Sequence, residues 1–413
     1  MTSPAVPSPP ARRDLWLAYA TAPFVMGYTD VFGLLTPLYA TSLGMSATEI
    51  GLLVGARSAL GVVLSIPAGA LMDRYGTRRL GLFFALGTVA LAPLYPALHW
   101  FPALLLLQCV VGCLVSLIVS SGQTVIALLG HGEARYIGRW SATARLGTTV
   151  GPLIAGAVWD LGGPWPAYAM ASLWGVPLAL ALLRLREPAS AIGGHAAPPP
   201  RFRLRDALPR LSDYTSTFAL LAVPTIAITI VVIFLRNATG GMQTSMYVVY
   251  LRDIGLTGTA IGALFAAVEI AHGVGAFFSG PAVDRLNPQW TLVATTALAI
   301  AFIAATPLLG GLFALLMLAQ VARGLCQGAA QPLLFSIQSK AVGRHRQGAI
   351  VGLRQTMNRV AAILVPPVMG VAADRWGVND SFLIVGAGLV AICAGLALAV
   401  ARVRHFGSAP PTP

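Results

Sequence analysis

Charged side chains are scarce in this sequence. Asp, Glu, Lys and Arg together make up 10% of the 413 residues, whereas hydrophobic residues make up 56%. The mean hydropathy is +0.76. A soluble chain of this length would need a far more polar surface to face water. The composition therefore excludes a soluble globular protein.

Cysteine and histidine are also too few and too scattered to build a chemical site. The 4 cysteines all lie within apolar runs, at spacings that fit neither a disulfide framework nor a metal site. The 6 histidines do not cluster, and the chain has no Gly-x4-Gly-Lys-Ser/Thr phosphate loop. We therefore expect neither an enzyme nor an ATP-driven machine, and we expect no cofactor and no metal centre.

Apolar runs are what the sequence does contain. A run of about 20 apolar residues is long enough to cross a hydrocarbon core of ~30 Å. Twelve such runs recur along the chain: 16–38, 48–71, 79–98, 101–122, 140–162, 165–185, 216–240, 258–282, 290–309, 311–335, 347–372 and 379–401. Transmembrane β-strands would instead be short and alternate in polarity. The runs predict an all-α membrane protein with twelve transmembrane helices.

Positive charge is distributed unevenly. The net charge is +13 and the pI is about 10.3, yet most of the 27 Lys and Arg fall in the tails and in alternate loops. If the N-terminus is cytoplasmic, these are the cytoplasmic loops, as the positive-inside rule requires. The basic pI is therefore a signal of topology and implies no nucleic-acid partner. Together with the single Lys, which is typical of a GC-rich genome, it predicts a multi-pass protein of the bacterial inner membrane with both termini cytoplasmic.

The chain also repeats itself. Residues 44–74 align with 255–285, and residues 138–156 align with 352–370. Aligned pairs include Gly51 with Gly262, Asp73 with Asp284, Arg145 with Arg359 and Pro152 with Pro366. Such a repeat predicts two pseudo-symmetric six-helix bundles with a binding site between them. The expected domains are a disordered tail at 1–15, a first bundle at 16–186, a Pro-rich cytoplasmic linker at 187–213, a second bundle at 214–401 and a tail at 402–413.

Eight charged residues are predicted to lie within the bilayer, where each costs at least ~2.5 kcal/mol. They are Asp30, Arg57, Arg145, Arg236, Glu269, Arg323, Arg354 and Arg359. Six bases face two acids, so water, an anionic substrate or lipid-facing edges of the bundle must satisfy the remainder. We predict that Asp30 and Glu269 couple transport to protons, because a carboxylate at this depth can cycle between its neutral and charged forms. The alternative is a static ion pair with a neighbouring Arg.

Polar residues at helical spacing predict the walls of a substrate cavity. Arg323, Gln327 and Gln331 share one helix face, and an Arg guanidinium suits a carboxylate or a phosphate. The predicted cavity residues are Arg57, Arg236, Arg323, Gln327, Arg354 and Asn358. Arg145 and Arg359 lie near the cytoplasmic ends of their helices, where we expect structural roles at the junction of the halves. His272, near Glu269, is expected to form a core hydrogen bond.

One charged turn resembles a known signature. Gly69-x3-Asp73-Arg74-x-Gly76-x-Arg78-Arg79 resembles the loop between helices 2 and 3 of the major facilitator superfamily, and the likeness in helix count and halves covers nearly the full chain. It implies the fold of that family and a cytoplasmic gate made of Gly69, Asp73, Arg74, Arg78, Asp284 and Arg285. Asp73 would bind the N-terminus of the eleventh predicted helix, at 347–372, and stabilise the outward-open state. The alternative for the arginines is plain membrane anchoring.

A second motif bears on the direction of transport. Gly147-x3-Gly151-Pro152-x2-Ala155-Gly156 resembles the helix 5 motif of the drug–proton antiporters of that family, with Ala155 in place of a Gly. The matching place in the second half reads Val365-Pro366-Pro367, so the motif belongs to the first half only, as in antiporters. The alternative is an ordinary glycine-rich packing helix.

These observations predict a proton-coupled secondary transporter of small organic solutes, anionic or amphiphilic, that works by alternating access. Export is preferred. An importer of organic anions such as carboxylates or siderophores is the alternative, and a non-transporting membrane receptor is the second alternative. The expected partners are a small-molecule substrate, protons and the lipid bilayer, and we expect a monomer.

The gate assignment predicts an effect of Asp73→Asn. Loss of the carboxylate should weaken the contact with the N-terminus of the eleventh predicted helix and increase opening between the two bundles at the cytoplasmic side. The labelling of cysteines introduced at the cytoplasmic side by a thiol reagent should change, and so should the transport rate. If neither changes, Asp73 is no part of a gate.

Overall fold

The computed structural model describes residues 12–131, 133–186, 219–283, 287–341 and 347–402. Every regular element in these ranges is a helix. In chain order they are α1 (Arg12–Ser42), α2 (Ala47–Tyr75), α3 (Thr77–Leu91), η1 (Ala92–Ala97), α4 (Phe101–Leu129), α5 (Ala134–Gly162), α6 (Pro164–Arg184), η3 (Ala219–Ala222), α9 (Pro224–Met242), η4 (Gln243–Tyr247), α10 (Val248–Asp253), α11 (Gly258–Val283), α12 (Pro288–Ala304), η5 (Thr306–Leu309), α13 (Phe313–Ala341), α14 (Gln347–Trp376) and α15 (Val378–Arg402). The predicted linker at 187–213 lies outside the described residues.

The helices confirm the predicted fold class. Because α3 continues into η1, and α9, η4 and α10 form one unbroken rod, the described residues make up twelve spans. Within the described ranges, 9 helices are long and apolar enough to cross a membrane. The other three spans are the long helices α1 and α5 and the shorter α12, which has 17 residues. The protein is an all-α, multi-pass membrane protein.

The seventh span differs from its predicted range of 216–240. It begins as an α-helix at Pro224, passes through a π-helical segment, η4, and ends at Asp253. The apolar run is interrupted at Gly240 and Gly241 and by the polar residues that follow, which makes the span look shorter in the sequence. Gln243 and Ser245 are nevertheless buried. The Ser245 hydroxyl donates to the Gly241 carbonyl at 2.6 Å, so its polar group is satisfied within its own helix.

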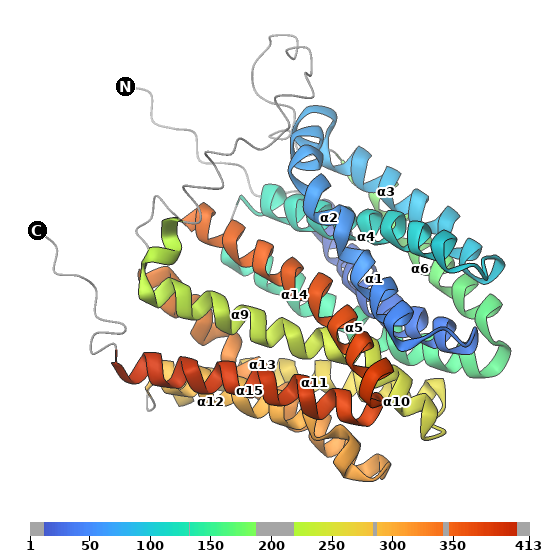
Figure 1. The fold of residues 1–413 in the computed structure, drawn as a ribbon. Helices are drawn as coiled ribbons and strands as arrows, with labels where there is room; N and C mark the ends of the chain where they lie inside the picture. The colour runs from blue at the N-terminus through green and yellow to red at the C-terminus, as the bar shows by residue number, and fades with distance from the viewer. Residues whose placement is uncertain (1–11, 132, 187–218, 284–286, 342–346, 403–413) are drawn as a thin grey trace, which may run out of the picture.

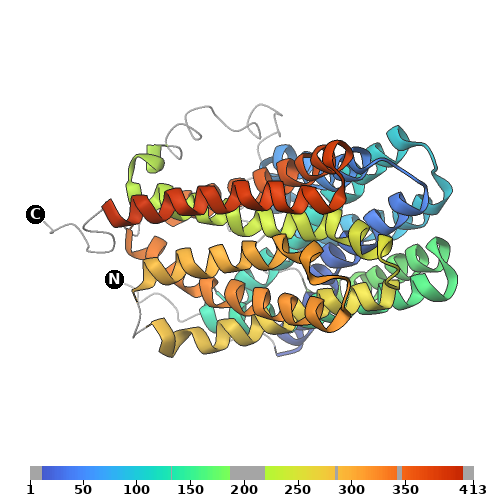
Figure 2. The same ribbon diagram turned by 60° about the horizontal axis from the view of Figure 1, so that its bottom comes forward.

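The helices form two bundles. In Figure 1 most of the blue-to-green helices α1 to α6 lie at the upper right and the yellow-green-to-red helices α9 to α15 at the lower left, and the teal helix α5 extends behind α14 and α9. In Figure 2 the blue helices again lie to the right of most of the second group. Two helix pairs make most of the contact between the bundles, α2 with α14 and α5 with α11. The sequence repeat relates α2 to α11 and α5 to α14, so one kind of contact is made twice.

The bundles meet most tightly at one side of the molecule. We call the side where α1 begins and α15 ends the terminal side, and the opposite side the far side. Toward the far side, a Cβ on Gly51 of α2 would lie 2.3 Å from the Pro366 carbonyl oxygen of α14. A Cβ on Gly262 of α11 would lie 2.4 Å from the Pro152 carbonyl oxygen of α5. Only glycine permits this approach, so the far side is closed by backbone packed on backbone.

The helix 5 motif serves two interfaces. A Cβ on Gly147 would lie 1.7 Å from the Pro23 carbonyl oxygen, and one on Gly151 would lie 2.9 Å from Val31, both in α1. These two glycines therefore pack α5 within its own bundle. Gly156 instead faces the other bundle, where its Cβ would lie 2.0 Å from the Gly258 carbonyl oxygen of α11.

The crowding at Gly147 predicts a loss of stability in Gly147→Ala. The added methyl group must push α1 away from α5, at a cost of about 1–3 kcal/mol. Thermal unfolding of the detergent-solubilised protein should show a lower midpoint. Gly138→Ala is the matched control, because a Cβ there, on the same helix, meets nothing within 4 Å. Equal midpoints for the two variants would contradict the packing role of Gly147.

Candidate functional site

A cavity of about 520 Å³ lies between the two bundles. Helices α1 and α2 line it from the first bundle, and α9, α11, α13 and α14 line it from the second, together with η4. The charged and strongly polar lining residues are Asp30, Arg57, Arg236, Asn237, Gln243, Glu269, His272, Gln327, Gln331, Arg354, Asn358 and Arg359. The volume is typical of small-molecule sites, but the lining is far more polar than the mostly apolar walls that such sites usually have.

The first bundle contributes one acid and one base to this cavity. Arg57 of α2 donates from Nη1 to the Thr29 carbonyl of α1 at 2.7 Å. The neighbouring Asp30 lies within electrostatic reach of both Arg57 and Glu269. Among the described residues, no hydrogen bond to the Asp30 carboxylate is found. Asp30 therefore presents a carboxylate to the cavity with an unused capacity to accept a proton or a donor group.

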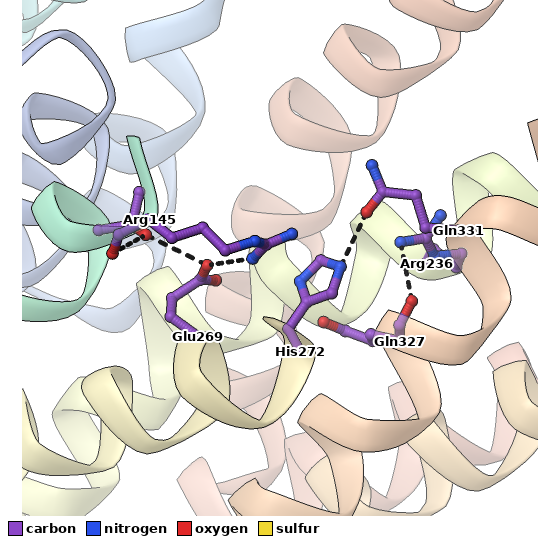
Figure 3. A network of polar contacts seen from close by, with 7 residues as sticks. Arg145, Arg236, Glu269, His272, Gln327 and Gln331 are labelled. Carbon is purple, nitrogen blue, oxygen red and sulfur yellow. Dashed lines mark hydrogen bonds and ion pairs between the residues drawn. The ribbon is translucent and has the colours of Figure 1, made fainter. Parts of the chain in front are cut away.

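An ion pair crosses the junction of the bundles. Arg145 of α5 approaches Glu269 of α11, with Nη1 3.3 Å from Oε2. The Thr148 hydroxyl donates to the same carboxylate oxygen at 3.3 Å. Both side chains of the pair are only partly exposed, at 34% and 27%. Figure 3 shows the Arg145 side chain extending from the first bundle between Glu269 and His272 of the second. Glu269 is therefore the acceptor of two groups that belong to the opposite bundle.

The remaining polar groups in Figure 3 lie within the second bundle. His272 of α11 and Gln331 of α13 share a hydrogen bond of 2.8 Å between Nε2 and Oε1. Arg236 of α9 donates to the Gln327 carbonyl at 3.3 Å, and the Gln327 side chain donates to the Thr239 hydroxyl at 2.7 Å. The hydrogen bond predicted for His272 is present, and it ties α11 to α13 at the wall of the cavity.

Helix α14 supplies the third wall. Asn237 of α9 donates to Asn358 Oδ1 at 2.7 Å, which fixes the two helices to each other. The Arg354 guanidinium lies 4.4 Å from the centroid of the Phe335 ring, a cation–π contact that leaves its N–H groups available. Arg359 also lines the cavity and reaches toward α2, where its Nη1 would meet a Cβ on Gly61 at 2.7 Å.

Arg323 is placed differently from the other predicted cavity residues. Its exposed fraction is 0%, and it is not among the residues that line the cavity. It donates to the Gln243 side chain and, at 3.2 Å, to the Thr239 carbonyl. Because Gln243 begins the π-helical segment, Arg323 holds the seventh span at the point where its winding changes. The geometry indicates a structural role.

The predicted gate is described only in part. Asp284 and Arg285 lie outside the described residues, and the description also leaves out the side chains of Asp73 and Arg74 and the surroundings of Gly69. Arg78 is described and donates to the carbonyls of Leu182 at 2.7 Å and Leu183 at 3.1 Å. These carbonyls belong to the last turn of α6, so Arg78 binds the C-terminus of a helix in its own bundle.

Sequence reasoning missed several groups at this site. Thr148 lies one helical turn after Arg145, and Asn237 directly follows Arg236. Both charged neighbours are themselves predicted from the sequence to lie within the bilayer. That proximity is the available signal for both. The pairing of Arg145 with Glu269 has no such signal, because it depends on which helices of the two bundles meet.

The burial of Arg323 predicts that two arginines of the second bundle respond differently to Arg→Leu. Arg323→Leu leaves the Gln243 side chain and the π-helical segment without their donor, so the unfolding temperature should fall. Arg354→Leu should preserve that temperature, because the guanidinium makes a ring contact at the cavity wall. Thermal unfolding in detergent measures both variants. An unfolding temperature unchanged by Arg323→Leu would contradict the structural role.

Comparison with known proteins places this fold and cavity in a family. The sequence model of the Major Facilitator Superfamily matches residues 15–235 and 229–413. The tetracycline resistance protein of class G from Vibrio anguillarum is 27% identical over 381 residues, covering 87% of this chain and 92% of that protein. The multidrug resistance protein MdtG from Enterobacter lignolyticus is 22% identical and covers 84% and 82% of the two chains.

A solved structure agrees with the sequence comparisons at the level of the fold. The crystal structure of the nucleoside transporter NupG superposes with a TM-score of 0.74 at 12% identity, covering 94% of this chain and 99% of that one. The family model covers nearly the whole sequence, and the twelve spans in two bundles with a cavity between them are what that family requires. The chain belongs to the Major Facilitator Superfamily of membrane transporters.

Proposed function

We propose that this transporter exports small organic solutes, anionic or amphiphilic, in exchange for protons. The cavity between the bundles carries the proposal: four guanidinium groups line it, from Arg57, Arg236, Arg354 and Arg359, against the two carboxylates of Asp30 and Glu269. The lining therefore has an excess of positive charge at a depth where unpaired charge is costly. A solute with a carboxylate, phosphate or sulfonate group would offset that excess.

The ion pair between the bundles supports proton coupling. Glu269 accepts from Arg145 and Thr148 of the opposite bundle, so a proton on Glu269 would remove the charge that attracts Arg145. Protonation would then alter a contact between the two rocking units directly. Asp30, which faces the cavity beside Arg57, is the second candidate for carrying a proton. A proton can shift the two states only by the difference in its affinity for them.

The positive-inside pattern supports a cytoplasmic location for the terminal side. With that orientation, the closed far side faces the periplasm. A cavity closed on that side would be reached from the cytoplasm, and the two bundles would rock about the central site to expose it to the opposite side.

The names of the relatives support export. Proteins named for tetracycline resistance and for multidrug resistance match more than four fifths of this chain, and a membrane transporter that confers resistance must lower the drug concentration in the cell. Import of organic anions is the second candidate. The positively charged cavity favours it as much as export, because the charge selects the solute and not the direction.

Proteoliposomes that contain a pH-sensitive dye test the proposal. Under an imposed pH gradient, organic anions such as aromatic carboxylates should trigger proton movement, and Glu269→Gln or Asp30→Asn should abolish it. Glu133→Gln is the control, because Glu133 pairs with Arg135 on the surface and both side chains are largely exposed. Movement of protons across the membrane in the direction opposite to that of the anion would support antiport.

Other outcomes would separate the parts of the proposal. A response to organic cations but not to anions would contradict the argument from the guanidinium groups. Solute flux without proton movement would make the protein a uniporter and leave both acids as partners of the arginines. Co-movement of anion and proton in the same direction would favour the importer.

A further inference from the structure

The first turns of α2 and α11 have a feature in common at the far side. In α2, the Ser46 hydroxyl accepts from the Glu49 amide at 3.2 Å. In α11, the Thr257 hydroxyl accepts from the Ala260 amide at 3.2 Å. Each capping residue therefore satisfies the third amide of its helix. The first two amides of each helix are left without an acceptor from their own bundle.

Those four amides are bound by carboxylates from the other bundle. Asp374, at the end of α14, accepts from the amides of Ala47 at 2.9 Å and Thr48 at 2.8 Å. Asp160, at the end of α5, accepts from the amides of Gly258 and Thr259, each at 2.7 Å. The Thr259 hydroxyl adds a bond of 2.6 Å to Asp160.

The two contacts are related by the internal repeat. Ser46 stands at the same place in its half as Thr257, and Asp160 at the same place as Asp374. Each bundle thus supplies one carboxylate and receives one. The acid always comes from the end of the bundle's fifth span, and it binds the start of the other bundle's second span.

We propose that Asp160 and Asp374 are positioning residues of the transport cycle that latch the far side closed. Each carboxylate combines hydrogen bonds to free amides with the favourable end of the helix dipole. The closed far side places acid and amides together, and rotation of the bundles away from each other there breaks both contacts at once. The latch therefore favours the state seen here over the state that is open at the far side.

The chemistry of the latch depends on neither the cargo nor the proton. Both carboxylates are exposed, outside the cavity, and none of their partners lines it. The inference rests on the proposed rocking of the two bundles alone. It can therefore hold even if the solute class and the proton coupling are wrong.

Hydrogen exchange of the purified full chain in lipid nanodiscs tests the latch. Asp160→Asn and Asp374→Asn should each raise exchange in the first turns of α2 and α11, and should lower it at the terminal-side starts of α5 and α14. The second change is the decisive one, because it reports closure of the terminal side. Each variant should shift the ratio of the two states about tenfold, and the shifts should multiply in the double variant because the acids share no partner.

Asp253→Asn is the matched control, since Asp253 is an exposed acid at the far side of the second bundle and should leave exchange unchanged. Thr259→Val, which removes one bond and keeps both carboxylates, should give a smaller shift in the same direction if the Asp variants fold poorly. Faster exchange confined to the two first turns, with the terminal side unaffected, would overturn the proposal and reduce both acids to local helix caps. Failure of the transport assay alone would leave this result untouched.

Discussion

A guanidinium group within a membrane needs an acceptor, and in this protein the acceptor is often a backbone carbonyl of a neighbouring helix. Arg57 donates to the Thr29 carbonyl, Arg236 to the Gln327 carbonyl and Arg323 to the Thr239 carbonyl. A helical carbonyl retains a second lone pair after its own helix bond, so this use costs no helical hydrogen bond. Each such contact ties two helices of one bundle together at the depth of the cavity.

The use of carbonyls has an electrostatic consequence. A carbonyl accepts a hydrogen bond from an arginine but does not neutralise its charge, so Arg57 and Arg236 are hydrogen-bonded and the cavity that they line remains positive. Arg145 differs from these arginines, because it donates to a carboxylate, that of Glu269, and forms an ion pair with it. Glu269 therefore lies at the junction of the bundles and neutralises the charge of Arg145, in one of the two ion pairs found among the described residues. Most of the other lining groups belong to the second bundle, which makes the site asymmetric although the fold is nearly symmetric.

Much of the fold and part of the site could be predicted from the sequence. Apolar runs of membrane-spanning length identify the spans, because the bilayer sets their length and leaves few alternatives. Charged residues within them predict cavity positions for Arg57, Arg236 and Arg354, which line the cavity, because charge at that depth needs a reason. The two acids predicted to carry protons, Asp30 and Glu269, line it as well. Helical spacing places Arg323 and Gln327 on one face, yet Gln327 lines the cavity and Arg323 does not. Periodicity gives the face of a helix but not the neighbour that covers each part of it.

The π-helical segment of the seventh span shows a further limit of such patterns and has its own consequence. A π-turn holds about one residue more than an α-turn, and each residue of an α-helix rotates the next by about 100°. A regular helical wheel drawn through the whole span therefore misplaces every side chain beyond Tyr247 by roughly that angle. Deleting one residue within Gln243–Tyr247 would restore regular winding, but it would turn α10 relative to α9 and change which side chains of α10 meet α1, α11 and α15. Five residues of altered winding thus set the angular register between the part of this helix that faces the solute and the part that faces its neighbours.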